Sequence, residues 1–237
     1  MADVISIFRN RDPREVPMYS IGRAAHHIGV PASTVRAWAV GQPYLASQGR
    51  SGAFPPVIDV PPGKPPRLTF NNLAELFVLA ALRRDNNLNL SAIRNAIENT
   101  RRSSNSAHPL LTMDFVTDGV KLYLQESGDR LLDVSSGLGG QYAIPAAIQS
   151  QLRRIEIDNN MAIRLYPLIQ DDDHRPVVID PEVSFGKPTI NGTGVAVSVV
   201  AGFVKAGETP ERVAREFGMA EKDVQAAAAW WHERAAA

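Results

Sequence analysis

The chain has 237 residues, a formal net charge of zero, 44% hydrophobic and 21% charged residues, and no cysteine. The lack of cysteine excludes a disulfide framework, a zinc–thiolate site and a thiol nucleophile. No apolar run reaches the roughly 20 residues that cross a bilayer, and no apolar signal segment follows the N-terminus, so we expect a cytoplasmic protein with no membrane partner.

The first predicted elements are two short helices joined by a tight turn. From Ile21 to Ile28, apolar residues recur at intervals of three and four, which places them on one helical face. Gly29 suits the left-handed end of this helix, and Pro31 suits the first turn of the next. A second helix is expected over residues 32–40. This is a helix-turn-helix pattern.

The exposed side of this helix pair is locally basic, although the whole chain is neutral. Residues 1–110 hold 13 Lys and Arg against 7 Asp and Glu, whereas residues 111–237 hold 12 against 18. No acidic residue lies between positions 16 and 58. Such asymmetry favours a nucleic-acid-facing N-terminal half. The candidate DNA-binding residues are Arg23 and Arg36 for phosphates, Ser33 and Thr34 for base edges, and Arg50.

Residues 41–67 are too rich in glycine and proline for a helix. The Val/Ile-containing segment PVIDV within them predicts a small hairpin or wing. Thr69 is a suitable N-cap for a helix over residues 70–84, and a further helix is expected over residues 90–102.

The central part changes character. Alternating apolar residues flank Asp118-Gly119, a two-residue hairpin turn signal. Residues 144–157 fit a helix that uses Ile144, Ile148, Leu152 and Ile155. The run Asp171–Asp173 is interpreted as an extended acidic linker at a domain boundary.

The C-terminal part predicts short strands followed by three short helices. Thr209-Pro210-Glu211 combines a capping hydroxyl, a first-turn proline and a carboxylate at a helix start, and this helix is expected to end at Gly218. The adjacent Trp230 and Trp231 cannot both lie on one buried face. We expect one in the core and assign the pair as candidate partner-binding residues.

The adjacent His26 and His27 have poor geometry for joint metal binding, and we expect one partly buried and one facing solvent. No paired carboxylates, nucleophile motif or phosphate-binding loop stands out. We therefore expect neither enzymatic activity nor a cofactor or metal.

The residues from Tyr19 to about Thr100 resemble the winged helix-turn-helix DNA-binding domain of the MerR superfamily. The resemblance is carried by YSIGRAAHHIGVPASTVRAW, followed by a wing, RLTFNNLAEL and LNLSAIRNAI. It implies that Arg36, in the T-x-R-x-W stretch, contacts the DNA backbone while Trp38 lies in the core.

The C-terminal stretch is similar to VapB-type antitoxins, a family formerly of unknown function that is usually encoded beside a PIN-like ribonuclease toxin. The resemblance is carried by IDP at residues 179–181, FGKPTINGT at residues 185–193 and TPERVAREFG. It implies a protein partner of the VapC type.

These observations predict an α+β, mostly helical protein. Its expected parts are a MerR-like winged helix-turn-helix domain (17–105), a central β-hairpin and helix segment (106–170) and a trihelical, helix-turn-helix-like antitoxin domain (175–237). The leading hypothesis is an antitoxin of a type II toxin-antitoxin system that neutralises a PIN-like ribonuclease and, as a homodimer, binds operator DNA to autoregulate. Two alternatives stay open: a MerR-like regulator that responds to a small molecule, and an interaction module that has lost DNA binding.

Overall fold

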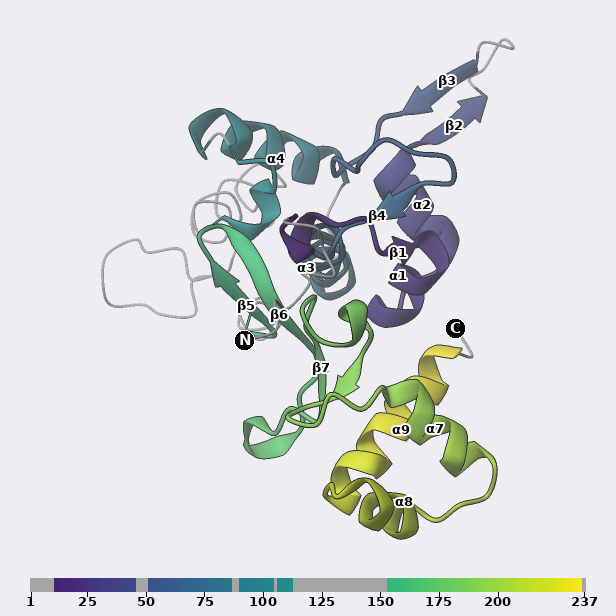
Figure 1. Ribbon diagram of the computed structural model, residues 1–237. Helices are drawn as coiled ribbons and strands as arrows, with labels where there is room; N and C mark the ends of the chain where they lie inside the picture. The colour runs from purple at the N-terminus through teal and green to yellow at the C-terminus, as the bar shows by residue number, and fades with distance from the viewer. Residues whose placement is uncertain (1–10, 46–50, 87–89, 105, 113–152, 236–237) are drawn as a thin grey trace, which may run out of the picture.

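The computed structural model describes residues 11–45, 51–86, 90–104, 106–112 and 153–235 (Figure 1). Within these ranges, helices combine with small antiparallel sheets, which confirms the α+β prediction. None of the helices in this described part has the length and apolar content needed to cross a bilayer. The α-helices are α1 (Ile21–Ile28), α2 (Ala32–Val40), α3 (Phe70–Asn86), α4 (Leu90–Ser104), α7 (Val197–Lys205), α8 (Pro210–Phe217) and α9 (Glu221–Ala235).

The strands form three sheets. A two-residue pair joins β1 and β4, a hairpin joins β2 and β3, and four strands follow the order β5-β6-β7-β8. The strands are β1 (Tyr19–Ser20), β2 (Gln42–Leu45), β3 (Ser51–Phe54), β4 (Arg67–Leu68), β5 (Ile155–Asp158), β6 (Met161–Leu168), β7 (Val177–Ile179) and β8 (Thr189–Ile190).

The predicted helix-turn-helix is confirmed, and local caps define it. The Ser20 hydroxyl accepts the backbone N–H of Arg23 at 3.2 Å and so begins α1. Gly29 ends α1 with a φ of 69°, a left-handed conformation that suits glycine. From α2, Val35 and Trp38 are buried in the core shared with α1 and α3.

The wing forms from a different stretch than we expected. The strands β2 and β3 make the hairpin that extends beyond α2 (Figure 1), whereas PVIDV contains no strand. Val57 and Ile58 are buried instead, and their backbone N–H groups donate to the Trp38 carbonyl at 2.7 and 3.4 Å. The prediction of strands in PVIDV is wrong because the end of α2 captures these backbone donors.

The helix α3 is the centre of the larger core. The Thr69 hydroxyl accepts the Asn72 N–H at 3.1 Å, which confirms the predicted cap. The strand β6 packs on α3, where the Ala162 N–H donates to the Asn71 side-chain oxygen at 2.9 Å. Ile155 lies in β5, so the helix expected over residues 144–157 is wrong at its C-terminal end. The Asp118-Gly119 hairpin signal lies in residues 113–152, which are outside the described residues.

A polar cluster, buried at His108 and Glu75 but exposed at Glu15, ties the N-terminal leader to this core. The His108 ring, in the residue before the 3-10 helix η2 (Pro109–Leu111), contacts two carboxylates at 2.9 Å each. One belongs to Glu75 of α3, and the other to Glu15 of the 3-10 helix η1 (Pro13–Glu15). These contacts join three segments that are far apart in the sequence.

The acidic run is a turn and not an extended linker. Asp171–Asp173 form a 3-10 turn, η4, between β6 and β7, which pair antiparallel in one sheet. The expectation of an extended linker is wrong because sheet pairing on both sides confines the turn. The strand β7 contributes Ile179 to the larger core and Val177 to a second core.

The second core is enclosed by α7, α8 and α9, which form the predicted C-terminal unit of three helices (Figure 1). The Thr209 hydroxyl accepts the Arg212 N–H at 3.3 Å and begins α8, and Gly218 ends it with a φ of 65°. Both follow the sequence prediction.

The C-terminal unit contacts the helix-turn-helix through α9 and α1. The Tyr19 hydroxyl, next to α1, donates to the Gly186 carbonyl at 2.8 Å and is buried there. Gly186 lies in the 3-10 turn η5 (Ser184–Gly186) that precedes β8. The domain boundaries predicted from the sequence stay a prediction.

Candidate nucleic-acid interface

The outer face of α2 carries the polar residues that the sequence pointed to. Ser33 and Arg36 are exposed and Thr34 is half-buried, while Val35 and Trp38 anchor the opposite face. The N-cap is Pro31, which offers no side-chain oxygen to the first turn. The backbone N–H groups at the start of α2 therefore lack a side-chain cap, and such groups favour an anion.

The wing extends the same side of the molecule beyond α2 (Figure 1). Tyr44 of β2 and Phe54 of β3 are 42% and 51% exposed, with ring centroids 4.5 Å apart. At the base of the wing, Arg94 donates from Nη2 to the Pro55 carbonyl at 2.8 Å, which ties the hairpin to α4. Arg50, assigned to DNA from the sequence, lies outside the described residues.

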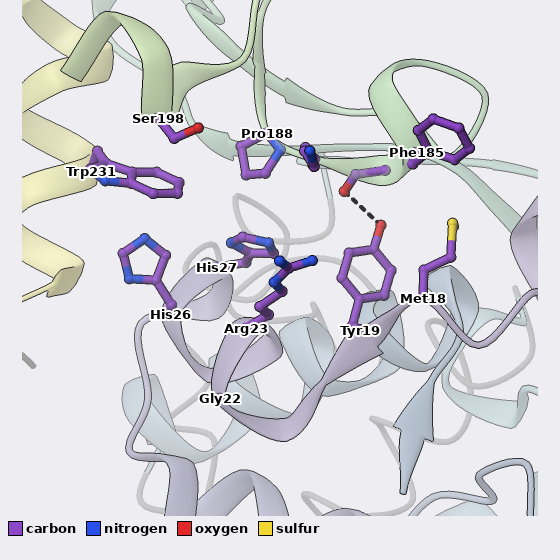
Figure 2. A pocket seen from close by; sticks show the side chains of 12 residues that line it. Met18, Tyr19, Gly22, Arg23, His26, His27, Phe185, Pro188, Ser198 and Trp231 are labelled. Atoms are coloured by element: carbon purple, nitrogen blue, oxygen red, sulfur yellow. Dashed lines mark hydrogen bonds between the residues drawn. The ribbon is translucent and has the colours of Figure 1, made fainter. Parts of the chain in front are cut away.

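Arg23 lies apart from the outer face of α2. Its side chain lines a cavity of about 480 Å³ between α1 and the C-terminal unit (Figure 2). Lys187 and Ser198, from the C-terminal unit, line the same cavity together with Trp231 of α9. The sequence could not indicate this placement, because the opposite wall comes from a segment more than 150 residues away.

The two adjacent histidines differ from our expectation. His27 is 5% exposed, and burial, with smaller effects from the charges of His26, Arg23 and Arg234, lowers its pKa to about 3. His26 is partly buried and does not face solvent freely, because its ring packs edge-on against the Trp231 ring, with the two ring centroids 4.4 Å apart. The expected solvent-facing histidine is wrong because α9 covers this side of α1.

The tryptophan pair divides between core and surface. Trp230 is 2% exposed in the second core, with the Arg234 guanidinium over its ring at 4.6 Å. Trp231 is half-buried against His26. Trp230 therefore offers no surface to a partner, and partner binding by Trp231 stays a prediction.

No metal centre adds to these features. Among the residues that the structure describes, no group of three or more His, Asp or Glu side chains is arranged to hold a metal ion. The arrangement on α2 is suited to non-covalent recognition: polar side chains and uncapped N–H groups on one exposed helix, backed by a rigid core.

Two family descriptions match parts of the chain. "Putative DNA-binding HTH domain" matches residues 17–97, which include α1, α2 and the wing. "Protein of unknown function (DUF433)" matches residues 177–230, from β7 into α9.

Whole-length relatives come from Mycobacterium tuberculosis. The "Putative antitoxin VapB45" is 30% identical over 217 residues, which cover 86% of this chain and 90% of that protein. The "Uncharacterized protein Rv2308" is 28% identical over 222 residues, 90% of this chain and 88% of that protein. The crystal structure of Rv2018 superposes with a TM-score of 0.67 at 27% identity, covering 90% of this chain and 97% of that one.

Proposed function

The chain belongs to the family of the "Putative antitoxin VapB45", and on this basis we propose that it acts in the cytoplasm as an antitoxin that also binds operator DNA. The finer proposal is that it neutralises a PIN-like ribonuclease of the VapC type and represses its own promoter. The observation that carries the DNA part is the exposed face of α2, with Ser33, Thr34 and Arg36 outward and Val35 and Trp38 in the core.

The proposed division of roles on α2 follows from side-chain chemistry. Arg36 pairs with a phosphate and fixes the register of the helix, since an arginine fork matches phosphate oxygens. Ser33 and Thr34, in the first turn, meet base edges in the major groove. The wing lies beyond α2 and meets the adjacent backbone, and the role of Arg50 in DNA binding is proposed from the sequence alone.

A homodimer is part of the proposal. One helix of nine residues offers only a small contact with the groove, whereas two copies on two half-sites give the contact area of a specific complex. The operator is therefore expected to contain two related half-sites.

The proposed toxin surface lies on the C-terminal unit. Val199 and Phe203, one helical turn apart on α7, are 44% and 37% exposed, and Phe185 in the η5 turn is 56% exposed. Large exposed apolar side chains of this kind are what a stable protein partner covers. We propose that the ribonuclease binds over them.

The test is co-expression with the product of the adjacent open reading frame, followed by affinity pull-down and a growth assay. A stable complex that restores growth otherwise stopped by the neighbour supports the antitoxin proposal. The double variant Val199→Ser/Phe203→Ser is expected to lose the complex, while Gln225→Ala on α9 retains it as a matched surface control.

DNA binding is tested separately by an electrophoretic shift on the promoter of this gene. A shift without a toxin complex would refute the antitoxin part and leave a transcriptional regulator. A toxin complex without a shift would refute the operator part.

A further inference from the structure

The cavity between α1 and the C-terminal unit has the composition of an anion site. Its lining includes the cations Arg23 and Lys187 but no Asp or Glu. Both cations are exposed side chains, and neither has an ion-pair partner among the residues that the structure describes. The charged side chains that line this cavity are therefore both positive.

A buried histidine in the wall lacks a hydrogen-bond partner. His27 is 5% exposed and its Nδ1 is fully buried without a partner. Because this atom is covered, a ligand in the cavity meets other atoms of the ring, which is uncharged at neutral pH since burial lowers the pKa of His27 to about 3. Figure 2 places the His27 ring between Arg23 and Pro188, facing the C-terminal unit.

The start of α7 adds a third favourable feature. Ser198 lies in the first turn of this helix, and the N-cap residue Ala196 makes no side-chain cap. The positive end of the helix dipole and a hydroxyl group thus belong to the same wall. Trp231 supplies an aromatic surface at the other side of the cavity (Figure 2).

We propose that this cavity binds a small organic anion attached to a flat ring, an aromatic carboxylate or an aromatic phosphate. The anionic group lies between Arg23 and Lys187, and the ring lies against Trp231. The volume of about 480 Å³ is within the range of small-molecule sites, about 300 to 1,000 Å³. Phe185 lines this cavity and also belongs to the proposed toxin surface, but the test of the site uses neither DNA nor toxin, so its outcome is separate from that of the proposed function.

The experiment titrates the full chain with three probes and follows tryptophan fluorescence and the thermal unfolding midpoint. Benzoate and phenyl phosphate carry the ring and the anion, and benzamide is the neutral control of the same shape. We expect benzoate or phenyl phosphate to bind with a Kd below about 1 mM and to raise the midpoint, since a ligand of the folded state stabilises it. Benzamide is expected to bind at least about tenfold more weakly.

Surface variants locate the site without disturbing the core. Lys187→Gln and Arg23→Gln are each expected to weaken binding of the anionic probe about tenfold, while Lys222→Gln, an exposed lysine on α9 outside the cavity, leaves it unchanged. The proposal is overturned if neither anion binds up to about 10 mM, if benzamide binds equally well, or if all three variants behave alike.

Discussion

The buried cluster around His108 yields a prediction about pH and stability. His108 is 7% exposed, and its two ring nitrogens contact the carboxylates of Glu75 and Glu15 at 2.9 Å each. Burial by itself lowers the pKa of His108, but the hydrogen bonds that its ring donates to the Glu15 and Glu75 carboxylates, with the attraction of their charges, outweigh burial and raise the pKa from 6.5 to about 10. The folded protein therefore holds a proton here that the unfolded chain releases near pH 6.5.

The direction in which stability changes with pH follows from proton linkage. A pKa that is higher in the folded state contributes stability that is fully present below about pH 6.5 and is lost as pH rises towards about 10. This rise in the pKa of His108 corresponds to at most about 5 kcal/mol, at about 1.4 kcal/mol per pH unit. We expect about 2 to 3 kcal/mol, because the Glu15 side chain is 43% exposed and solvent screens its share.

The assay is urea unfolding at several values between about pH 6 and about pH 10, on the unmodified chain and on His108→Gln. The unmodified chain is expected to lose stability across this interval, and His108→Gln to show a flatter profile. At the acidic end, His108→Gln is destabilised by about 3 kcal/mol, because Glu75 loses its cation, and burial, which already raises the pKa of Glu75, then favours its protonated form. Glu75→Gln in the same variant is expected to recover part of this loss.

Two results would refute this reasoning. One is a pH profile of His108→Gln parallel to that of the unmodified chain, which would assign the titration to other groups. The other is an unmodified chain whose stability rises between about pH 6.5 and about pH 10, which is opposite to the sign derived from the raised pKa.

Three further predictions concern the helix-turn-helix and its docking. Arg36→Ala is expected to lower the salt dependence of operator affinity by about one unit of slope, measured by fluorescence anisotropy at several salt concentrations, with Lys222→Ala as a control; an unchanged slope would contradict the phosphate contact. Gly29→Ala, at a φ of 69°, is expected to cost about 1 kcal/mol in thermal unfolding, whereas Gly22→Ala, whose added methyl meets no atom within 4 Å, is expected to stabilise α1; equal effects would contradict the backbone argument. Tyr19→Phe, which leaves the Gly186 carbonyl without its hydrogen bond, is expected to lower the free energy of unfolding by about 1 to 2 kcal/mol; no change would show that water replaces the hydroxyl.

The sequence predicted the elements whose signals are local. Helix starts at Thr69 and Thr209 and helix ends at Gly29 and Gly218 rest on side chains within three residues of the cap, and the structure confirms all four. The strands were harder to predict from the sequence. PVIDV has the composition of a strand, but its backbone donors go to the end of α2, and Ile155 leaves the expected helix because β6 pairs with it.

In the candidate site, too, features set by nearby residues could be predicted, and features set by residues far away in the sequence could not. The outward face of α2 follows from the positions of Val35 and Trp38 within one helix, so Ser33, Thr34 and Arg36 could be found from the sequence. The environment of Arg23 and His26 could not, because Lys187 and Trp231 reach them only through packing of the C-terminal unit on α1. A pattern of spacing carries no information about such a partner.

The helix α1 has a double role, and this connects the two proposed activities. Its buried residues support α2, and its other side contacts the C-terminal unit through the Tyr19–Gly186 hydrogen bond and the His26–Trp231 ring contact. A ligand or partner that binds only the docked arrangement stabilises it by its own binding free energy. If docking in turn alters how α2 meets DNA, thermodynamic reciprocity requires that operator binding change the affinity of the C-terminal unit for its partner by the same factor. Coupling of this kind needs no chemistry, only that α1 belong to both surfaces.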